Sequence, residues 1–301
     1  MSQLFELYRP QLRNPVLLAA FAGWNDAAEV ATGTLRALMR QWNAEPCAEI
    51  EPEEFFVFTE TRPQVRIVDS IQRRIVWPQN QFYYARLDGS DRDVLILVGT
   101  EPQLKWKTFI GLVLDYAKSF DVNLVVGLGG LLADVLHSRP PVLTGSVAEP
   151  ELARRVSRLG LQRSRYEGPT GILGVLGAEC RARGISSGSI WGNVPHYLPG
   201  LTNPPIMEAM AKALSDLLDF PIDLHDFQRG QSRFEAMVAR AIAEDADVAS
   251  YVRQLEERDQ PARDEPQAIG ELSPPSELPS AEILVQELEE FFRRRSDDEN
   301  T

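Results

Sequence analysis

The first two-thirds of this 301-residue chain alternate short apolar, β-branched runs with amphipathic helical patterns. That order is typical of a largely parallel sheet covered by helices, because parallel strands are joined by helical crossovers. The main strands are predicted at Val16–Phe21, Glu54–Phe58, Val94–Val98, Leu124–Val126, Val142–Val147 and Ser187–Trp191, with weaker edge strands at Arg74–Trp77 and Gln81–Tyr84. Helices are predicted near Asp26–Gln41, Leu104–Phe120, Glu149–Leu159, Thr170–Arg183 and Pro205–Leu218.

The chain after Phe220 lacks further strand patterns and is predicted to be helical. Residues 1–228 are expected to form an α/β core domain and residues 229–301 an acidic helical extension. The apolar residues between Phe234 and Asp259 recur on one face, which predicts a single helix there. A stretch rich in Pro, Glu and Ser near 260–280 has the composition of a linker.

The end of the extension combines an apolar stripe with most of the negative charge. A last helix over 281–296 would place Leu288, Phe291 and Phe292 on one side, and such a stripe needs cover, so these are candidate interaction residues. From Phe234 to the end there are 18 acidic and 7 basic side chains, a balance of −11 out of a formal net charge of −13 for the whole chain.

Charge and composition exclude several classes of partner. A net charge of −13 argues against binding to nucleic acid or to anionic membranes, because both need a basic surface. No apolar run approaches the ~20 residues that span a bilayer, and no secretion signal is recognised, so the chain is expected in the cytoplasm. Cys47 and Cys180 lack partners at metal-ligand spacing, so reduced, buried thiols and no metal site are expected.

The turn after the first predicted strand contains the first candidate site. Asp26 and Glu29 have the spacing of a capping box, in which Asp26 accepts first-turn amide hydrogens while Glu29 reaches back. Gly23, Trp24, Asn25 and Asp26 would also lie at the carboxyl end of a strand, where open α/β sheets bind ligands and free helix amides favour an anion. The turn has no Lys or Arg and lacks dinucleotide-loop glycine spacing, which favours a capped strand-to-helix junction.

A glycine-rich segment after the fourth predicted strand resembles a nucleotide loop only in part. Gly127, Gly129 and Gly130 follow the strand directly. Leu132 stands where the dinucleotide motif needs Gly or Ala, and no Lys-Ser/Thr pair follows as in a phosphate-cradling loop. We therefore predict a sharp turn beside another chain or helix, because glycine permits positive φ and close backbone approach.

Further polar residues follow the strands at Val94–Val98 and Ser187–Trp191. Glu101 and His196 are the candidate catalytic residues, and Thr100 and Asn193 are candidates for ligand binding in a cleft shared with the first turn. A lone His in a Pro-rich loop is more often structural, and no G-x-S-x-G motif is present. The residues alone name no reaction.

Three motifs carry a family resemblance: the G-W-N-D-A turn, Y-x-G-P-T-G-I-L-G from Tyr166, and a strand ending W-G-x-V-P-H-Y. From about Pro15 to Phe220 the chain resembles the proteasome assembly chaperone 2 family, and its helical extension resembles the actinobacterial branch. The resemblance implies a three-layer α/β/α core related to nucleoside phosphorylases and peptide hydrolases without their accepted catalytic set. Relatives that dock on proteasome α-rings end in hydrophobic-Tyr-any, whereas this chain ends Asp298-Glu-Asn-Thr301, which argues against docking by such a tail.

The fold class expected is therefore a three-layer α/β/α sandwich with a largely parallel mixed sheet and a C-terminal helical extension. The resemblance implies a non-catalytic assembly factor without cofactor. Its expected partners are further copies of itself, a trimer among the states considered, and proteasome α subunits or another cytoplasmic protein. The alternative is an enzyme that performs phosphorylase-like transfer or hydrolysis of a small molecule at the carboxyl ends of the strands. An open cleft shared by the candidate residues would favour the enzyme, whereas their use in caps and buried turns would favour the assembly factor.

Overall fold

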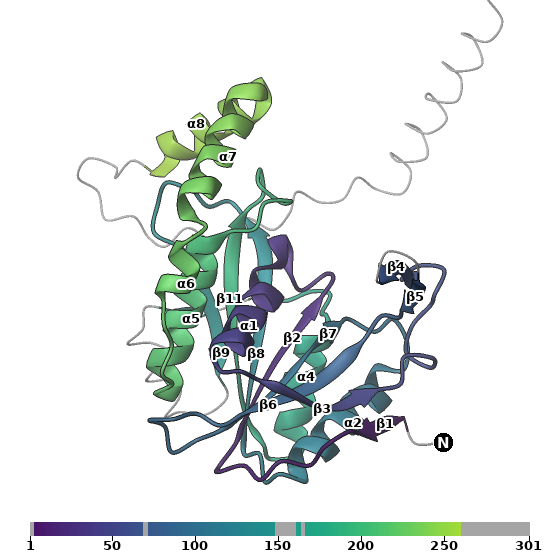
Figure 1. The fold of residues 1–301 in the computed structure, drawn as a ribbon. Coiled ribbons are helices and arrows are strands. Elements are labelled where there is room, and N and C mark those ends of the chain that lie inside the picture. Colours follow the sequence, from purple (N-terminus) through teal and green to yellow (C-terminus); the bar gives the residue numbers. More distant parts are fainter. Residues whose placement is uncertain (1–2, 69–71, 148–160, 164–165, 260–301) are drawn as a thin grey trace, which may run out of the picture. The chain divides into compact units, whose positions relative to one another are not determined.

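The computed structural model describes residues 3–68, 72–147, 161–163 and 166–259. These form a nine-stranded sheet with helices on both faces and a separate two-stranded sheet (Figure 1). The strands are β1 (Leu4–Glu6), β2 (Val16–Ala22), β3 (Glu45–Ile50), β4 (Gln64–Val68), β5 (Gln72–Val76), β6 (Asn80–Ala85), β7 (Val94–Thr100), β8 (Leu124–Ala133), β9 (Leu143–Val147), β10 (Gln162–Arg163) and β11 (Ser186–Pro195). The helices are η1 (Ala27–Glu29), α1 (Val30–Gln41), α2 (Trp106–Lys118), α4 (Ile172–Ala182), α5 (Pro204–Leu218), α6 (His225–Gln228), α7 (Gln231–Glu244) and α8 (Ala246–Asp259).

Some predictions lie outside the described residues. They are the helix at Glu149–Leu159, the linker near 260–280 and the stripe of Leu288, Phe291 and Phe292. The division into domains at residue 228 likewise stays a prediction.

The strand order of the large sheet is β1-β3-β6-β7-β2-β8-β11-β9-β10. Its four central strands, β7, β2, β8 and β11, run parallel to one another. Antiparallel strands flank them, with β6 beside β7 and β9 beside β11. The predicted α/β fold with a mixed sheet is confirmed, and its parallel part is the centre.

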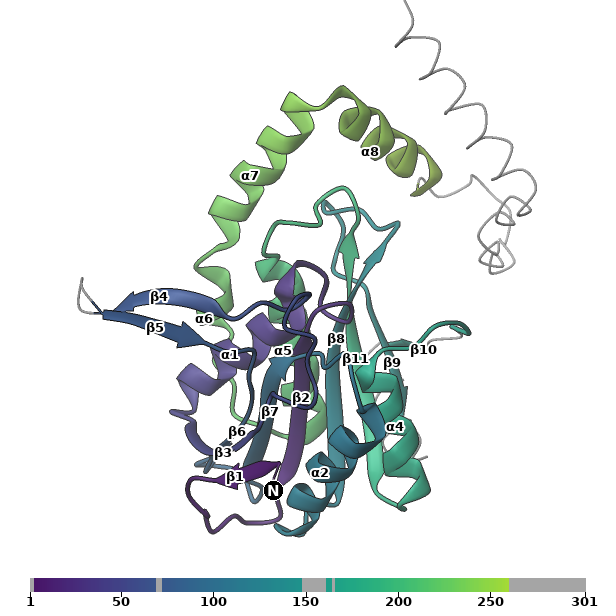
Figure 2. The same cartoon turned by 90° about the vertical axis from the view of Figure 1, so that its right-hand side faces the viewer.

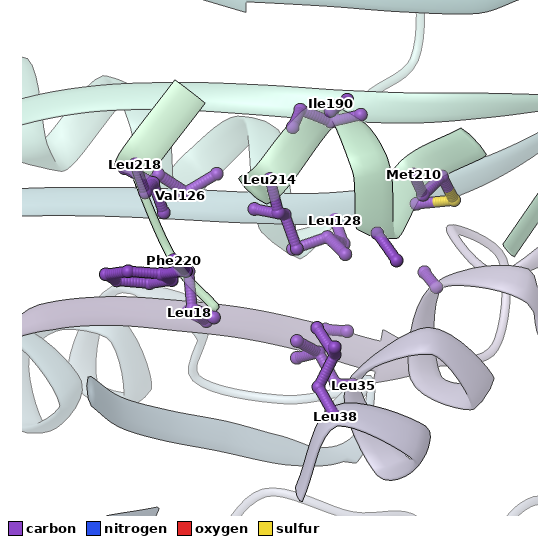
Figure 3. Close-up of a cluster of buried hydrophobic side chains, with 14 of the residues drawn as sticks. Leu18, Leu35, Leu38, Val126, Leu128, Ile190, Met210, Leu214, Leu218 and Phe220 are labelled. Atoms are coloured by element: carbon purple, nitrogen blue, oxygen red, sulfur yellow. The ribbon is translucent and has the colours of Figure 1, made fainter. Parts of the chain in front are cut away.

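The central strands are buried on both faces, which explains their unbroken apolar runs. Successive side chains of a strand point to opposite faces. Leu18 of β2 belongs to a cluster that includes Leu35 of α1 and Leu214 of α5 (Figure 3). Leu17, on the other face, belongs to a cluster that includes Phe109 of α2. Fully burying one such side chain stabilises the fold by about 1.5–3 kcal/mol, so both helix layers are needed.

The second cluster also contains both cysteines. Cys47 and Cys180 are buried free thiols, as predicted. Burial raises the pKa of each to about 11, which keeps both thiols protonated at neutral pH.

The predicted strand at Glu54–Phe58 is wrong, because this segment forms turns. The Phe55 carbonyl oxygen accepts hydrogen bonds from the amides of Gln103 and Leu104. The Phe55 ring packs edge-on against Phe109 of α2, with ring centroids 5.3 Å apart. The apolar run therefore reflects burial against a helix rather than strand pairing.

The predicted sharp turn at Gly127, Gly129 and Gly130 is also wrong, because β8 continues through all three glycines. The close approach expected of these glycines is confirmed. A Cβ atom on Gly129 would overlap the ring of Trp191, and one on Gly130 would lie 2.6 Å from Cγ2 of Val30. These glycines admit neighbouring side chains to the surface of an extended strand.

The single helix predicted from Phe234 to Asp259 is instead two helices, α7 and α8. Asp245 between them has an extended backbone. Its Oδ1 accepts hydrogen bonds from the amides of Asp247 at 2.9 Å and Val248 at 3.1 Å, which starts α8 with an N-cap. None of the helices in the described ranges has the length and apolar content that crossing a bilayer requires.

Several short strands were not predicted: β1, β3, β4 and β10. The predicted edge strand at Arg74–Trp77 overlaps β5, which pairs with β4 rather than with the large sheet. We call β4 and β5 the β4–β5 hairpin, and it stands away from the large sheet in both views (Figures 1 and 2). Trp77 packs on Phe58 at the base of this hairpin, with ring centroids 4.8 Å apart.

Candidate functional site

The carboxyl ends of β2 and β7 meet at one edge of the sheet. The amide of Glu101 donates to the carbonyl oxygen of Ala22 at 2.9 Å, which brings the two following turns together. Gly23 has φ +125°, a conformation that favours glycine, and a Cβ there would lie 3.4 Å from Cβ of Glu101. This junction is the first cluster of candidate residues.

The Glu101 side chain caps a helix that begins 71 residues later in the sequence. Its Oε1 accepts a hydrogen bond from the amide of Ile172, the first residue of α4, at 2.7 Å. The same oxygen accepts one from Nδ2 of Asn25 at 2.6 Å. A carboxylate at a helix N-terminus satisfies a free amide and interacts favourably with the helix dipole. Glu101 is therefore engaged in holding β7, the first turn and α4 together.

Asn25 links the first turn to β8. Its carbonyl oxygen accepts from the amide of Gly130 at 2.7 Å, and Asp26 forms an isolated parallel bridge with Gly130. The residue is 1% exposed, and its Oδ1 has no hydrogen-bond partner among the described residues. Asn25 is thus a buried connector that leaves one polar atom unused.

Asp26 accepts hydrogen bonds from the first turn of α1, as predicted, but it is not the N-cap residue, because Glu29 stands at that position. Its Oδ1 accepts from the amides of Ala31 at 2.8 Å and Thr32 at 3.3 Å in the first turn of α1. Burial raises the pKa of Asp26 above its ordinary value, while the hydrogen bonds from these residues act in the opposite direction. The predicted return contact of Glu29 is wrong, because Glu29 has φ +54° and its carboxylate lies 3.8 Å from the Arg36 guanidinium.

His196 lies in a second cluster, at the carboxyl ends of β8 and β11. Its Nδ1 is 3.1 Å from Oδ1 of Asp134 and 3.3 Å from the carbonyl oxygen of Ala133. The Tyr251 hydroxyl donates to the same Asp134 oxygen at 2.7 Å and lies 3.4 Å from Nε2 of His196. These contacts attach α8 to the strand ends.

His137 and Tyr197 extend the second cluster. The Tyr197 hydroxyl oxygen accepts from the His137 amide at 2.9 Å and lies 2.7 Å from Nδ1 of the same residue. Burial lowers the pKa of His137 and raises the pKa of Tyr197, so both groups are held neutral near pH 7. The Tyr197 ring also packs on Tyr251, which adds to the attachment of α8.

The two clusters of candidate residues lie at different positions along β8. Asn25 contacts Gly130 and His196 contacts Ala133, three residues further on, which is about 10 Å of strand. No hydrogen bond or ion pair found for the described residues joins Glu101 to His196. Within the same ranges, no group of three or more His, Cys, Asp or Glu side chains could hold a metal ion.

The other candidates occupy the rims of these clusters. Trp24 exposes its side chain to solvent. Thr100 is half-buried, and its amide donates to the carbonyl oxygen of Gln79. The amide of Asn193 donates to the carbonyl oxygen of Val142, and its buried Oδ1 lacks a hydrogen-bond partner among the described residues.

Substitutions of Glu101 distinguish a role as a helix cap from a role as a general base. Glu101→Ala should lower the free energy of unfolding by about 2 kcal/mol, because the Ile172 amide and Asn25 Nδ2 both lose their acceptor. Glu101→Gln keeps a side-chain carbonyl oxygen and should cost less than about 1 kcal/mol. Urea unfolding followed by circular dichroism measures both. Equal losses in the two variants would contradict the capping role.

Comparison with known proteins places these elements in a family. The model of the PAC2 family matches residues 20–242. A structure of a proteasome-assembly chaperone homologue from Mycobacterium tuberculosis is 38% identical, with 79% of this chain and 99% of that chain covered and a TM-score of 0.71. A PAC2 family protein from Streptomyces avermitilis is 34% identical, with 79% and 99% covered and a TM-score of 0.70.

A more distant structure shares the fold alone. An archaeal proteasome activator from Pyrococcus furiosus is 20% identical, with 79% of this chain and 97% of that chain covered and a TM-score of 0.64. No curated protein matches the sequence.

Proposed function

Because this chain belongs to the PAC2 family, we propose that it is a non-catalytic factor in protein assembly that acts as a homo-oligomer and binds other proteins. The observation that carries the proposal is the use of Glu101, one of the two candidate catalytic residues, as the cap of α4. A relative described as a proteasome-assembly chaperone homologue supports the same reading. Proteasome α subunits are accordingly the first partners to look for.

Exposed apolar residues near the carboxyl ends of the central strands are candidate anchors for such a partner. Trp24, Leu131 and Leu132 are exposed after the carboxyl end of β2 and at that of β8. Large exposed apolar and aromatic side chains are the usual anchors of protein interfaces. The C-terminal stripe of Leu288, Phe291 and Phe292 is a second candidate contact, on the strength of its sequence pattern.

The enzyme alternative is supported by two unused polar atoms. Oδ1 of Asn25 and Oδ1 of Asn193 are buried without hydrogen-bond partners among the described residues, and a small polar ligand at the strand ends would satisfy them. The two candidate catalytic side chains are engaged elsewhere, Glu101 with α4 and His196 with Asp134. The assembly role is therefore the better supported of the two.

Affinity purification of the tagged full-length chain from its host at low salt tests the proposal. We expect a stoichiometric protein, identified by mass spectrometry, that is lost from the variant Trp24→Ala/Leu132→Ala or from Leu288→Ala/Phe291→Ala/Phe292→Ala. Met237→Ala, an exposed apolar change on α7, is the matched control and should retain it. A chain that recovers no partner and is monomeric at all concentrations would contradict the proposal.

Substitutions serve this purpose better than truncation at the start of the extension. Phe234 and Val238 of α7 pack with Leu198, which follows β11, in a small buried cluster. Removing the chain from Phe234 onward would expose Leu198 and confuse a lost interface with a damaged fold.

A further inference from the structure

The β4–β5 hairpin has an exposed apolar face. Val65 and Ile75 are opposite one another across the hairpin, and Ile67 lies two residues from Val65 on the same face. Their side chains belong to residues that are 60%, 55% and 68% exposed, respectively. A two-stranded hairpin that pairs with no other strand is marginally stable in water, so this face gains from being covered.

The same hairpin is basic in an otherwise acidic chain. Residues 62–77 contain four Arg and one Asp, a balance of +3, whereas the whole chain has −13. Arg66 and Arg74 are directly opposite one another, and like charges in this arrangement destabilise a strand pair. Among the described residues no carboxylate forms an ion pair with Arg66, Arg73 or Arg74. Arg73 lies opposite Ile67, on the apolar face of the hairpin, where an acidic surface would meet it.

One edge of the large sheet combines exposed apolar residues with negative charge. The β1–β3 edge consists of β1, which is the terminal strand, and the adjoining residues 45–54. Residues 45–54 contain five Glu and no basic residue. Phe5, Leu7 and Tyr8 are exposed at the same edge. Phe5 is directly opposite Glu49, so an apolar and an acidic side chain share one face, as Ile67 and Arg73 do on the hairpin.

We propose that the β4–β5 hairpin of one copy of this chain docks on the β1–β3 edge of a second copy. Val65, Ile67 and Ile75 then cover the apolar residues of the edge, while Arg73, on the same face of the hairpin, meets its glutamates. The inference rests on the proposed homo-oligomer and names the two surfaces that form it. A second copy is the occupant because one chain carries both complementary surfaces, and the rest of the chain has a charge of −16 against the +3 of residues 62–77.

The proposed contact joins two different surfaces, so each copy both gives a hairpin and receives one. Such head-to-tail contacts close into rings when the rotation between copies permits, and otherwise continue as filaments. Because the contact is charged as well as apolar, association should weaken as salt concentration rises.

Sedimentation velocity of the full chain over a range of concentrations tests the inference, with charge reversal on each surface. The hairpin variant is Arg73→Glu, on the apolar face of the hairpin, and the edge variant is Glu49→Lys, directly opposite Phe5. Each should raise the dissociation constant for self-association at least about tenfold. The two variants mixed together should associate again, because the reversed hairpin of one then meets the reversed edge of the other.

The control variant is Arg181→Glu, an exposed basic residue on α4. It changes the net charge as much as the hairpin variant and should leave self-association unchanged. Circular dichroism melts of all variants should match the unmodified chain, which excludes unfolding as the cause.

The possible failures are distinguishable. Self-association that survives the hairpin variant would overturn the docking inference but leave the homo-oligomer standing. Loss of association in the hairpin variant without loss in the edge variant would mean that the hairpin meets another surface, which also overturns the inference. A chain that is monomeric at every concentration would overturn both the homo-oligomer and its proposed interface.

Discussion

Replacing Gly130 by Ala should lower the free energy of unfolding by about 3 kcal/mol, the upper part of the range for overpacked sites. The added Cβ would lie 2.6 Å from Cγ2 of Val30, 2.9 Å from the carbonyl oxygen of Ala27 and 3.0 Å from its amide nitrogen. Two of these atoms are backbone, so a rotamer change cannot remove the contact. The 2.7 Å hydrogen bond from the Gly130 amide to Asn25 would be disturbed as well. Urea unfolding followed by circular dichroism measures the loss.

Gly177 in α4 supplies the matched control. A Cβ there meets nothing within 4 Å. Gly177→Ala should therefore raise stability by about 0.5–1 kcal/mol, because Ala restricts the unfolded chain more than Gly and suits a helix interior better. If both Gly→Ala variants behaved alike, the close approach of β8 to the first turn of α1 would not be what requires Gly130.

Replacing Asp93 by Ala should cost about 3 kcal/mol or more, because a buried carboxylate network loses its centre. Asp93 is fully buried at the start of β7. Its Oδ2 accepts from the Arg13 amide at 2.7 Å, and its Oδ1 accepts from Nη2 of Arg13 at 2.7 Å and the Leu87 amide at 3.1 Å. Asp91→Ala, two residues away and exposed, should change stability by no more than about 0.5 kcal/mol. Similar losses in both variants would contradict this role.

The same network predicts a pH dependence. Burial by itself raises the pKa of Asp93, but the hydrogen bonds from Arg13 and Leu87 outweigh it and hold the pKa below its ordinary value. A lowered folded-state pKa gives stability that is fully present above the unfolded value of about 3.9 and is lost as pH falls through the folded value. The difference between the unmodified chain and Asp93→Ala should thus shrink below about pH 4. An unfolding series between pH 7 and 3 tests the sign.

The local sequence pattern predicted an element correctly where only one physical cause could produce that pattern. The apolar run of β2 could be read as a central strand because both faces of that strand are buried. The apolar run around Phe55 has the same appearance but results from packing on α2. Gly129 and Gly130 were read as a turn because the neighbours that require glycine, Trp191 and Val30, come from other parts of the chain. Local sequence cannot distinguish these cases.

The sequence predicted which residues belong to the candidate site better than it predicted the contacts that they make. Asp26 was expected to accept hydrogen bonds from the first turn of the following helix, and it does, because this contact spans only five or six residues. The contact of Glu101 with the amide of Ile172 joins residues 71 apart, and no local motif signals it. The pairing of His196 with Asp134 and Tyr251 likewise depends on where α8 returns to the strand ends. Contacts of this length follow from topology rather than from spacing.

The strand order has a consequence for synthesis on the ribosome. β2 ends at Ala22, yet its two neighbours in the sheet, β7 and β8, begin at Val94 and Leu124. At ~5–20 residues per second, β2 waits on the order of ten seconds for its second partner to be made. Until β7 has been made, an almost wholly apolar strand has neither neighbour with which to pair, and until β8 follows it has only one. The first segment of this protein therefore stays without its full set of sheet partners for much of the synthesis of the core.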